Sequence, residues 1–130
     1  MNSKAVRFTG YALTGAFTLF MLFDVGIKLI RHPMVEETMR QLGFRDGLGF
    51  PIGVIETICL VLYLVPRTAV LGAVLFMGIF GGGIAVHLRQ GDPLFSHVLF
   101  GVYLGLFMWG GLWLRDPDLR AVFPVRTMAA

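Results

Sequence analysis

The sequence predicts an all-α integral membrane protein, a four-helix bundle with short interfacial helices after the first and fourth transmembrane helices. Of its 130 residues 56% are hydrophobic, and only 11 are Lys or Arg and 8 are Asp or Glu. A soluble domain carries about a quarter of its residues as charged side chains, and a disordered chain is poor in apolar residues. Four apolar stretches are each long enough for a helix to cross a hydrocarbon core of roughly 30 Å.

The four apolar stretches predict transmembrane helices within a single domain, residues 1–130. The spans are expected at 8–30, 48–65, 68–88 and 94–114. Helices are expected because no stretch alternates between apolar and polar residues, and because open strands in lipid leave backbone groups without hydrogen bonds. The first apolar run lacks a small-x-small cleavage site, so we interpret it as a retained helix and not as a signal peptide.

Turn residues separate the spans. Pro66 predicts a tight hairpin between the second and third spans, with Thr68 capping the third. Gly91 is expected to stop the third span, and Asp92 followed by Pro93 is expected to cap the fourth. The same Asp-Pro pair recurs at 116–117, where it predicts a short interfacial helix through Phe123.

The longest connection, residues 31–47, predicts an amphipathic helix on the membrane surface that begins at Pro33 and ends before Gly43. This helix could form a lid over the adjoining half of the bundle. Its apolar residues Val35, Met39 and Leu42 alternate with polar Glu36, Glu37 and Arg40.

Small residues are expected where helices approach closely, because lipid supplies no hydrophobic drive for association. Gly78 with Gly82, and Gly101 with Gly105, form two small-xxx-small pairs. We interpret them as helix packing within one bundle in preference to a dimer interface. The single cysteine, Cys59, excludes a dithiol mechanism by this chain alone.

The charges also bear on location and partners. With both termini on one side of the membrane, that side carries more Lys and Arg than the other, which favours an inner-membrane protein with both termini in the cytoplasm. The net charge of +3 comes from residues scattered at the ends of apolar runs. A nucleic-acid partner would need a basic stripe, so none is expected.

Five ionisable residues lie within or at the ends of the spans: Asp24, Lys28, Glu56, His87 and His97. Such groups are costly in lipid unless they are paired or hydrated. Because successive helices run in opposite directions, all five are expected in the half of the membrane away from the termini. The first two are four residues apart on one helix face, which favours an ion pair. These five residues are the candidate catalytic residues.

The chemistry of this polar layer suits the headgroup of a quinone or another amphiphile, which needs proton donors and acceptors. Glu56 is the expected acceptor and His97 the expected donor. Phe17, Phe20 and Tyr63 would then line a tail channel, although such aromatic residues are more often plain core. A metal ion is less favoured because no compact ligand motif is present. A haem bracketed by the two histidines is less favoured because carboxylates lie nearby and the location is shallow. A purely structural layer, whose polar groups satisfy one another, remains an alternative.

Several short segments within about residues 7–120 form a recognisable pattern. They are Leu22-Phe23-Asp24, Ile27-Lys28-Leu29, Gly53-Val54-Ile55-Glu56, residues 65–72, and residues 87–93 with His97. With these segments the chain resembles the DoxX-like family of small four-helix membrane proteins. The family takes its name from a subunit associated with a terminal quinol oxidase and a thiosulfate:quinone oxidoreductase in archaea, so the resemblance implies a four-helix fold and a redox or quinone-linked role. The resemblance carries over the five polar residues as site candidates without roles.

Three functions therefore remain open. The leading hypothesis is a redox-linked component that binds a quinone or other amphiphile and contacts membrane lipid and a membrane or redox protein. The second is an assembly or scaffold subunit, because the chain is also similar to membrane proteins that assist assembly of partners. The third is a proton-transfer enzyme, an isomerase or cyclase, acting on a lipid-like substrate. The sequence leaves open the ligand, the metal content and whether the chain forms homo-oligomers.

Overall fold

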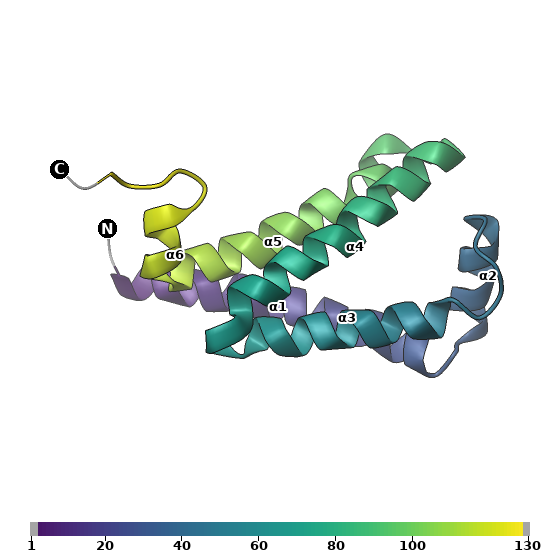
Figure 1. The fold of residues 1–130 in the computed structure, drawn as a ribbon, viewed down its shortest axis with the longest axis horizontal. Helices are drawn as coiled ribbons and strands as arrows, with labels where there is room; N and C mark the ends of the chain where they lie inside the picture. The colour runs from purple at the N-terminus through teal and green to yellow at the C-terminus, as the bar shows by residue number, and fades with distance from the viewer. Residues whose placement is uncertain (1–2, 129–130) are drawn as a thin grey trace.

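The computed structural model describes residues 3–128, and these residues form helices joined by short turns. Figure 1 shows α1, α3, α4 and α5 running side by side, with the first and last described residues at one end of the bundle and α2 lying across the other. The predicted all-α fold class is confirmed. The elements are α1 (Ser3–Leu29), α2 (Pro33–Gln41), α3 (Gly49–Leu64), η1 (Pro66–Thr68), α4 (Ala69–Gln90), η2 (Leu94–Val98), α5 (Phe100–Arg115) and α6 (Pro117–Val122).

Among residues 3–128, three segments are long and apolar enough to cross a membrane: Ser3–Leu29, Pro66–Gln90 and Leu94–Arg115. The remaining apolar helix, α3, has 16 residues, which at 1.5 Å per residue gives about 24 Å. It is therefore shorter than a typical hydrocarbon core of about 30 Å. Together with the family described below, these helices establish an integral membrane protein.

Two of the predicted helix boundaries are made by the expected residues. Gly91 takes the left-handed conformation (φ 72°) and ends α4, as a residue without Cβ does at low cost. Asp116 caps α6, because its Oδ1 accepts hydrogen bonds from the amides of Asp118 (3.0 Å) and Leu119 (3.2 Å), and Pro117 follows at the first helical position.

Two other predicted caps differ from the structure. Thr68 does occupy the N-cap position of α4, but its side chain makes no capping hydrogen bond there. Its hydroxyl donates instead to the carbonyl of Leu62 (2.8 Å), at the end of α3. Asp92 does not cap the fourth span, because its carboxylate is bound to His87. The expected helix 94–114 consequently begins with the π-helical turn η2, and α5 starts only after a break at Leu99.

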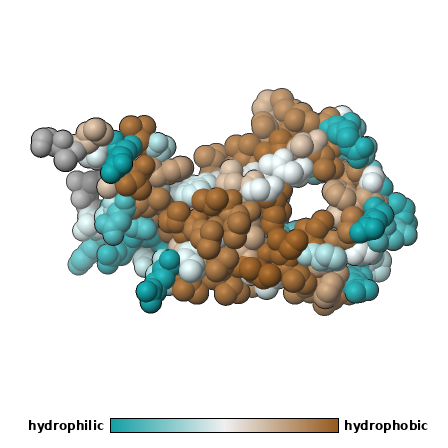
Figure 2. All heavy atoms as spheres, in the orientation of Figure 1, coloured by the Kyte–Doolittle hydropathy of each residue, from teal (hydrophilic) through white to brown (hydrophobic). Residues whose placement is uncertain are grey.

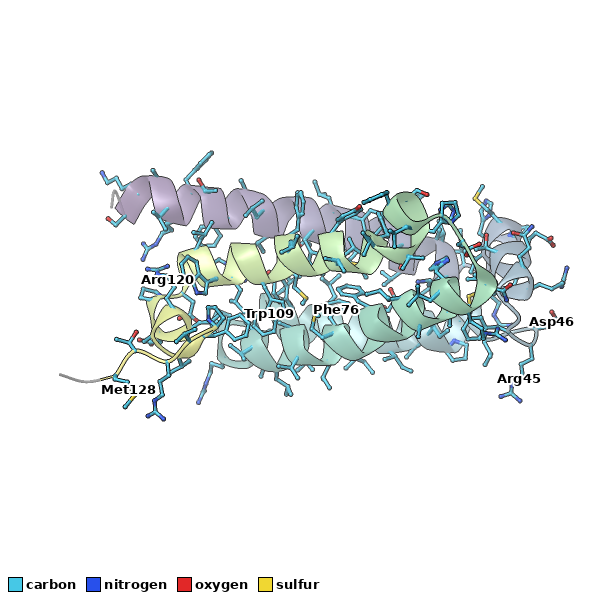
Figure 3. The ribbon with its side chains drawn as sticks, turned by 90° about the horizontal axis from the view of Figure 1, so that it is seen from above. Arg45, Asp46, Phe76, Trp109, Arg120 and Met128 are labelled. Atoms are coloured by element: carbon cyan, nitrogen blue, oxygen red, sulfur yellow. The ribbon has the colours of Figure 1, made fainter. Side chains whose placement is uncertain are left out.

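The core is an aromatic cluster at the centre of the bundle. Phe17 packs edge-on against Tyr63 and Phe76, with ring centroids 5.4 Å apart in both pairs. Figure 3 shows Phe76 between the helices. The Tyr63 hydroxyl donates to the carbonyl of Met108 (2.6 Å), so this buried polar group is satisfied. Phe17 and Tyr63 are fully buried here, and their predicted place in a tail channel is wrong.

At the end of the bundle that holds the termini, α1 packs against α5 and α3 against α4. A Cβ atom on Gly10 of α1 would lie 2.9 Å from the carbonyl oxygen of Gly111 in α5. A Cβ atom on Gly72 of α4 would lie 2.7 Å from the Cα of Tyr63 and 2.8 Å from the carbonyl oxygen of Cys59, both in α3. These glycines let the two backbones touch, which fixes this end as the tightly packed one.

Toward the α2 end the helices change partners. A Cβ atom on Gly53 of α3 would lie 2.8 Å from the Cβ of Lys28 in α1, and one on Gly101 of α5 would lie 3.0 Å from the carbonyl oxygen of Phe80 in α4. The pair α1–α3 therefore separates from the pair α4–α5, as Figure 1 shows. Figure 2 shows an opening through the bundle between the two pairs, with hydrophobic atoms around much of its rim.

The predicted glycine pairs behave differently from each other. Gly101 does pack within the bundle, and Gly105 makes ordinary contact with Met77. Gly78 and Gly82 have no atom within 4 Å of an added Cβ, so the prediction that they pack helices together is wrong. Both instead line a cavity described below.

Candidate functional site

All five polar residues singled out from the sequence line one cavity of about 180 Å³ at the open end of the bundle. Each of the four long helical segments contributes, since the residues come from α1, α3, α4 and η2. Phe20 lines the same cavity, as do Gly83 and Gly101, which leave space beside the two imidazoles. The five residues are Asp24, Lys28, Glu56, His87 and His97.

Three of the five residues form a directly bonded triad between α1 and α3. The Nζ atom of Lys28 donates to Oδ2 of Asp24 (2.6 Å) and to Oε1 of Glu56 (2.5 Å). The pair on α1 is the predicted one, because residues four apart lie on one helix face. Glu56 is reached because Gly53, one turn earlier on α3, allows α1 to approach that helix closely. Gly53 therefore brings Glu56 within reach of Lys28, although Gly53 takes no part in the hydrogen bond.

The triad is buried unevenly. The Glu56 side chain is 2% exposed, whereas those of Lys28 and Asp24 are 17% and 25% exposed. The ammonium group of Lys28 neutralises only one of the two carboxylates. The triad therefore carries one net negative charge, unless one carboxylate is protonated, in which case the triad is neutral. A charge in an apolar interior is costly, and a ligand that supplies or removes a proton changes that charge. The triad is therefore suited to proton exchange.

His87 is held by the turn that follows α4. The amide of Asp92 donates back to the carbonyl of His87 (3.1 Å) and the amide of Gly91 to that of Leu88 (3.1 Å), the pair of bonds made by a left-handed helix ending. This turn places the Asp92 carboxylate 2.6 Å from Nδ1 of His87. The carboxylate fixes the orientation of the ring and leaves Nε2 for another partner.

His97 lies in the π-helical turn η2. Its ring centroid is 5.7 Å from that of His87, with the ring planes at 70° to each other. Its Nδ1 is 2.7 Å from the hydroxyl of Ser96. Between residues 3 and 128, no hydrogen bond joins the two histidines to the Asp24–Lys28–Glu56 triad, so the cavity separates two distinct polar groups.

Two larger cavities adjoin this one. A cavity of about 400 Å³ shares Lys28, Glu56 and His87 with it and extends along apolar side chains of α2, α3 and α4. Another of about 290 Å³ shares Lys28 and His87 and lies beneath α2. Sites for small molecules commonly measure about 300–1,000 Å³. The cavity of about 400 Å³ lies within this range, the one of about 290 Å³ falls just short of it, and the polar one of about 180 Å³ is well below it.

The helix α2 forms the predicted lid. Met39 and Leu42 line both of the larger cavities, and Val35 is 7% exposed because it packs on Gly49 at the start of α3. Beyond α2, an Arg89 Nη2 atom donates to the carbonyl of Leu42 (3.0 Å). The residue after Leu42, Gly43, has φ 88°, and a Cβ there would lie 2.7 Å from the same Nη2. Arg89 thus ties the lid to the end of α4.

The variant Arg89→Gln is expected to release the lid without unfolding the bundle, because it removes a bond to an exposed turn and touches no core residue. Hydrogen exchange should become faster at the amides of Gly43 and Phe44, which in the intact protein donate to carbonyls of α2. Arg45→Gln is the matched control, since Arg45 is exposed and points away from the bundle (Figure 3). Unchanged exchange in Arg89→Gln would contradict the tie.

Among the described residues, no group of three or more His, Cys, Asp and Glu side chains is arranged around a common point that a metal ion could occupy.

Asp92 was not identified as part of the site from the sequence, because its place before Pro93 indicated a helix cap. Its position immediately after Gly91 was the available signal, since a left-handed glycine turns the next residue back toward the previous turn.

Comparisons with known proteins give one family. The model of the DoxX-like family matches residues 12–111, which include all five cavity residues. No curated protein and no solved structure matches the chain.

Proposed function

The chain belongs to the DoxX-like family, and from this premise we propose that it binds a quinone or another amphiphile with its headgroup in the polar cavity, as part of a redox-linked membrane component. One observation carries the proposal. A cavity bounded by a proton-exchanging triad and two imidazoles adjoins apolar cavities that open through the side of the bundle.

The geometry divides such a ligand between two environments. The cavity of about 180 Å³ accommodates a small polar ring, and the adjoining cavity of about 400 Å³ accommodates an apolar substituent. An amphiphile that diffuses in the membrane enters sideways between the pairs α1–α3 and α4–α5, and α2 covers it afterwards. Phe20 stands at the inner side of the polar cavity.

The proposed roles follow from the contacts. Glu56 accepts a proton, because it is the most buried member of the triad and Lys28 alone must serve both its carboxylate and that of Asp24. His97 donates a proton, because it faces the same cavity from the opposite helix pair and is itself exposed to the surroundings. In the proposed orientation the protein lies in an inner membrane with both termini in the cytoplasm. The site then lies in the half of the membrane away from the cytoplasm.

A test uses a decyl-substituted benzoquinone and the purified full chain in lipid nanodiscs, with bound quinone measured by mass spectrometry after washing. Glu56→Gln and His97→Phe are each expected to weaken binding at least about tenfold, since a hydrogen bond to a charged group contributes about 1.5–3 kcal/mol. Glu37→Gln, in an exposed ion pair on α2, should leave binding unchanged. Equal binding by wild type and Glu56→Gln would refute the proposal.

The same variants separate the other candidate functions. A scaffold subunit predicts that Glu56→Gln lowers the melting temperature while the wild type shows no saturable quinone binding. A proton-transfer enzyme acting on a lipid-like substrate predicts an isomerised or cyclised product without any electron acceptor. Mass spectrometry of whatever copurifies with the gently solubilised protein distinguishes a quinone from another lipid.

A further inference from the structure

A second polar cavity, of about 140 Å³, lies at the tightly packed end of the bundle. Its walls are the first turns of α1, the end of α5 and the beginning of α6. Three arginines face it: Arg7, Arg115 and Arg120. It shares no lining residue with the cavity of the candidate site, so it needs an explanation of its own.

Within residues 3–128, none of the three arginines forms an ion pair with an acidic side chain. Asp116, which directly follows Arg115, uses its Oδ1 to cap α6. Three positive charges around one small cavity repel one another, and an anion in the cavity removes that repulsion.

Two of the three guanidinium groups are held in place with donors to spare. Arg115 donates from Nε to the Thr14 hydroxyl (3.1 Å) and lies over the ring of Tyr63, 5.6 Å from its centroid. Arg120 donates from Nη1 to the carbonyls of Trp113 and Leu114, both at 2.8 Å. Within the described residues the remaining N–H groups of both side chains have no hydrogen-bond partner, and those groups are available to a ligand.

Figure 3 shows Arg120 beside the end of α5, facing the beginning of α1. Fixed guanidinium groups match phosphate oxygens in two-pronged hydrogen bonds. The cavity, at about 140 Å³, is several times the volume of roughly 30 Å³ that one water occupies in the liquid.

We propose that this cavity is a phosphate-binding site, which takes either the headgroup phosphate of an anionic phospholipid or a free phosphate ion. It lies where the candidate membrane span Ser3–Leu29 begins and the span Leu94–Arg115 ends, and Val6 and Leu114 give it an apolar wall. A lipid phosphate lies at that level, with its chains alongside the helices.

The test measures the binding of two ligands to the purified full chain in a neutral detergent. Native mass spectrometry follows the binding of phosphatidylglycerol against zwitterionic phosphatidylcholine, and thermal unfolding follows stabilisation by inorganic phosphate. Arg7→Gln is the main variant, because Arg7 is exposed and makes no hydrogen bond within the described residues. Arg67→Gln is the matched control, since Arg67 is exposed in η1 at the same end of the bundle but outside the cavity.

We expect wild type to prefer phosphatidylglycerol, and we expect Arg7→Gln and Arg115→Gln each to weaken that binding at least about fivefold while Arg67→Gln leaves it unchanged. Stabilisation by inorganic phosphate that Arg7→Gln abolishes would identify a free phosphate as a sufficient ligand. Binding of the lipid alone would identify the headgroup. Binding of neither, or an equal loss in Arg7→Gln and Arg67→Gln, would overturn the proposal.

Discussion

Replacing Lys28 by Met is expected to lower the free energy of unfolding by about 3–5 kcal/mol, the usual cost of removing one partner from a buried ion pair. The substitution leaves the carboxylates of Asp24 and Glu56 facing one apolar interior without their shared cation. It also removes the hydrogen bond from Lys28 to Glu56 that connects α1 to α3 beside the cavity, and the one to Asp24 within α1. The measurement is unfolding by SDS titration in mixed micelles.

The chain supplies a matched control for this prediction. Arg40 also bonds two carboxylates, those of Glu37 (3.1 Å) and Asp46 (3.4 Å), but its side chain is 60% exposed. Exposed ion pairs contribute about 0–1 kcal/mol, so Arg40→Met should change stability very little. Adding Glu56→Gln to Lys28→Met should restore part of the loss, because it removes one unpaired carboxylate. Similar losses in Lys28→Met and Arg40→Met would show that the triad does not stabilise the fold.

The second large effect is expected for Gly72→Ala. The added Cβ would lie well inside contact distance of the backbone of Tyr63 and Cys59, and backbone atoms cannot move aside as a side chain does. The helices α3 and α4 would have to separate along the contact that holds the closed end of the bundle. We expect a loss of about 3 kcal/mol or more, at the upper end of the cost of overpacking a core, measured by the same titration.

Gly81→Ala provides the comparison on the same helix. An added Cβ at Gly81 has no atom within 4 Å, and alanine in a helix interior is favoured over glycine by about 0.5–1 kcal/mol. The variant should therefore be neutral or slightly more stable than wild type. The opposite ranking of the two alanine variants would contradict the close approach of α3 and α4 at Gly72.

Much of this architecture could be predicted from the sequence because lipid imposes few choices. Apolar length and the turn residues at 66 and 91 located the spans, and alternating helix direction placed five ionisable residues at one depth. The ion pair on α1 followed from the spacing of Asp24 and Lys28. Depth in the membrane depends on position along one helix, so it can be derived without knowing how the helices pack.

The lateral packing of the helices could not be derived from the sequence, because it depends on contacts between helices. The sequence does not distinguish Gly72, which touches another backbone, from Gly82, which faces an empty cavity. Nor does it show that Tyr63 is core, because aromatic residues in a membrane helix are apolar whether they face protein or lipid. The bond from Lys28 to Glu56 likewise depends on the approach of α1 to α3 at Gly53.

The change of helix partners along the bundle makes the protein asymmetric between the two leaflets. At one end the glycine contacts of Gly10 and Gly72 close the helices upon each other, and at the other the pairs stand apart around Lys28 and His87. Under the proposed function, an amphiphile dissolved in the leaflet at the open end meets the entrance directly. One confined to the opposite leaflet would first have to cross the bilayer, so its own rate of flipping would limit how fast it reaches the site.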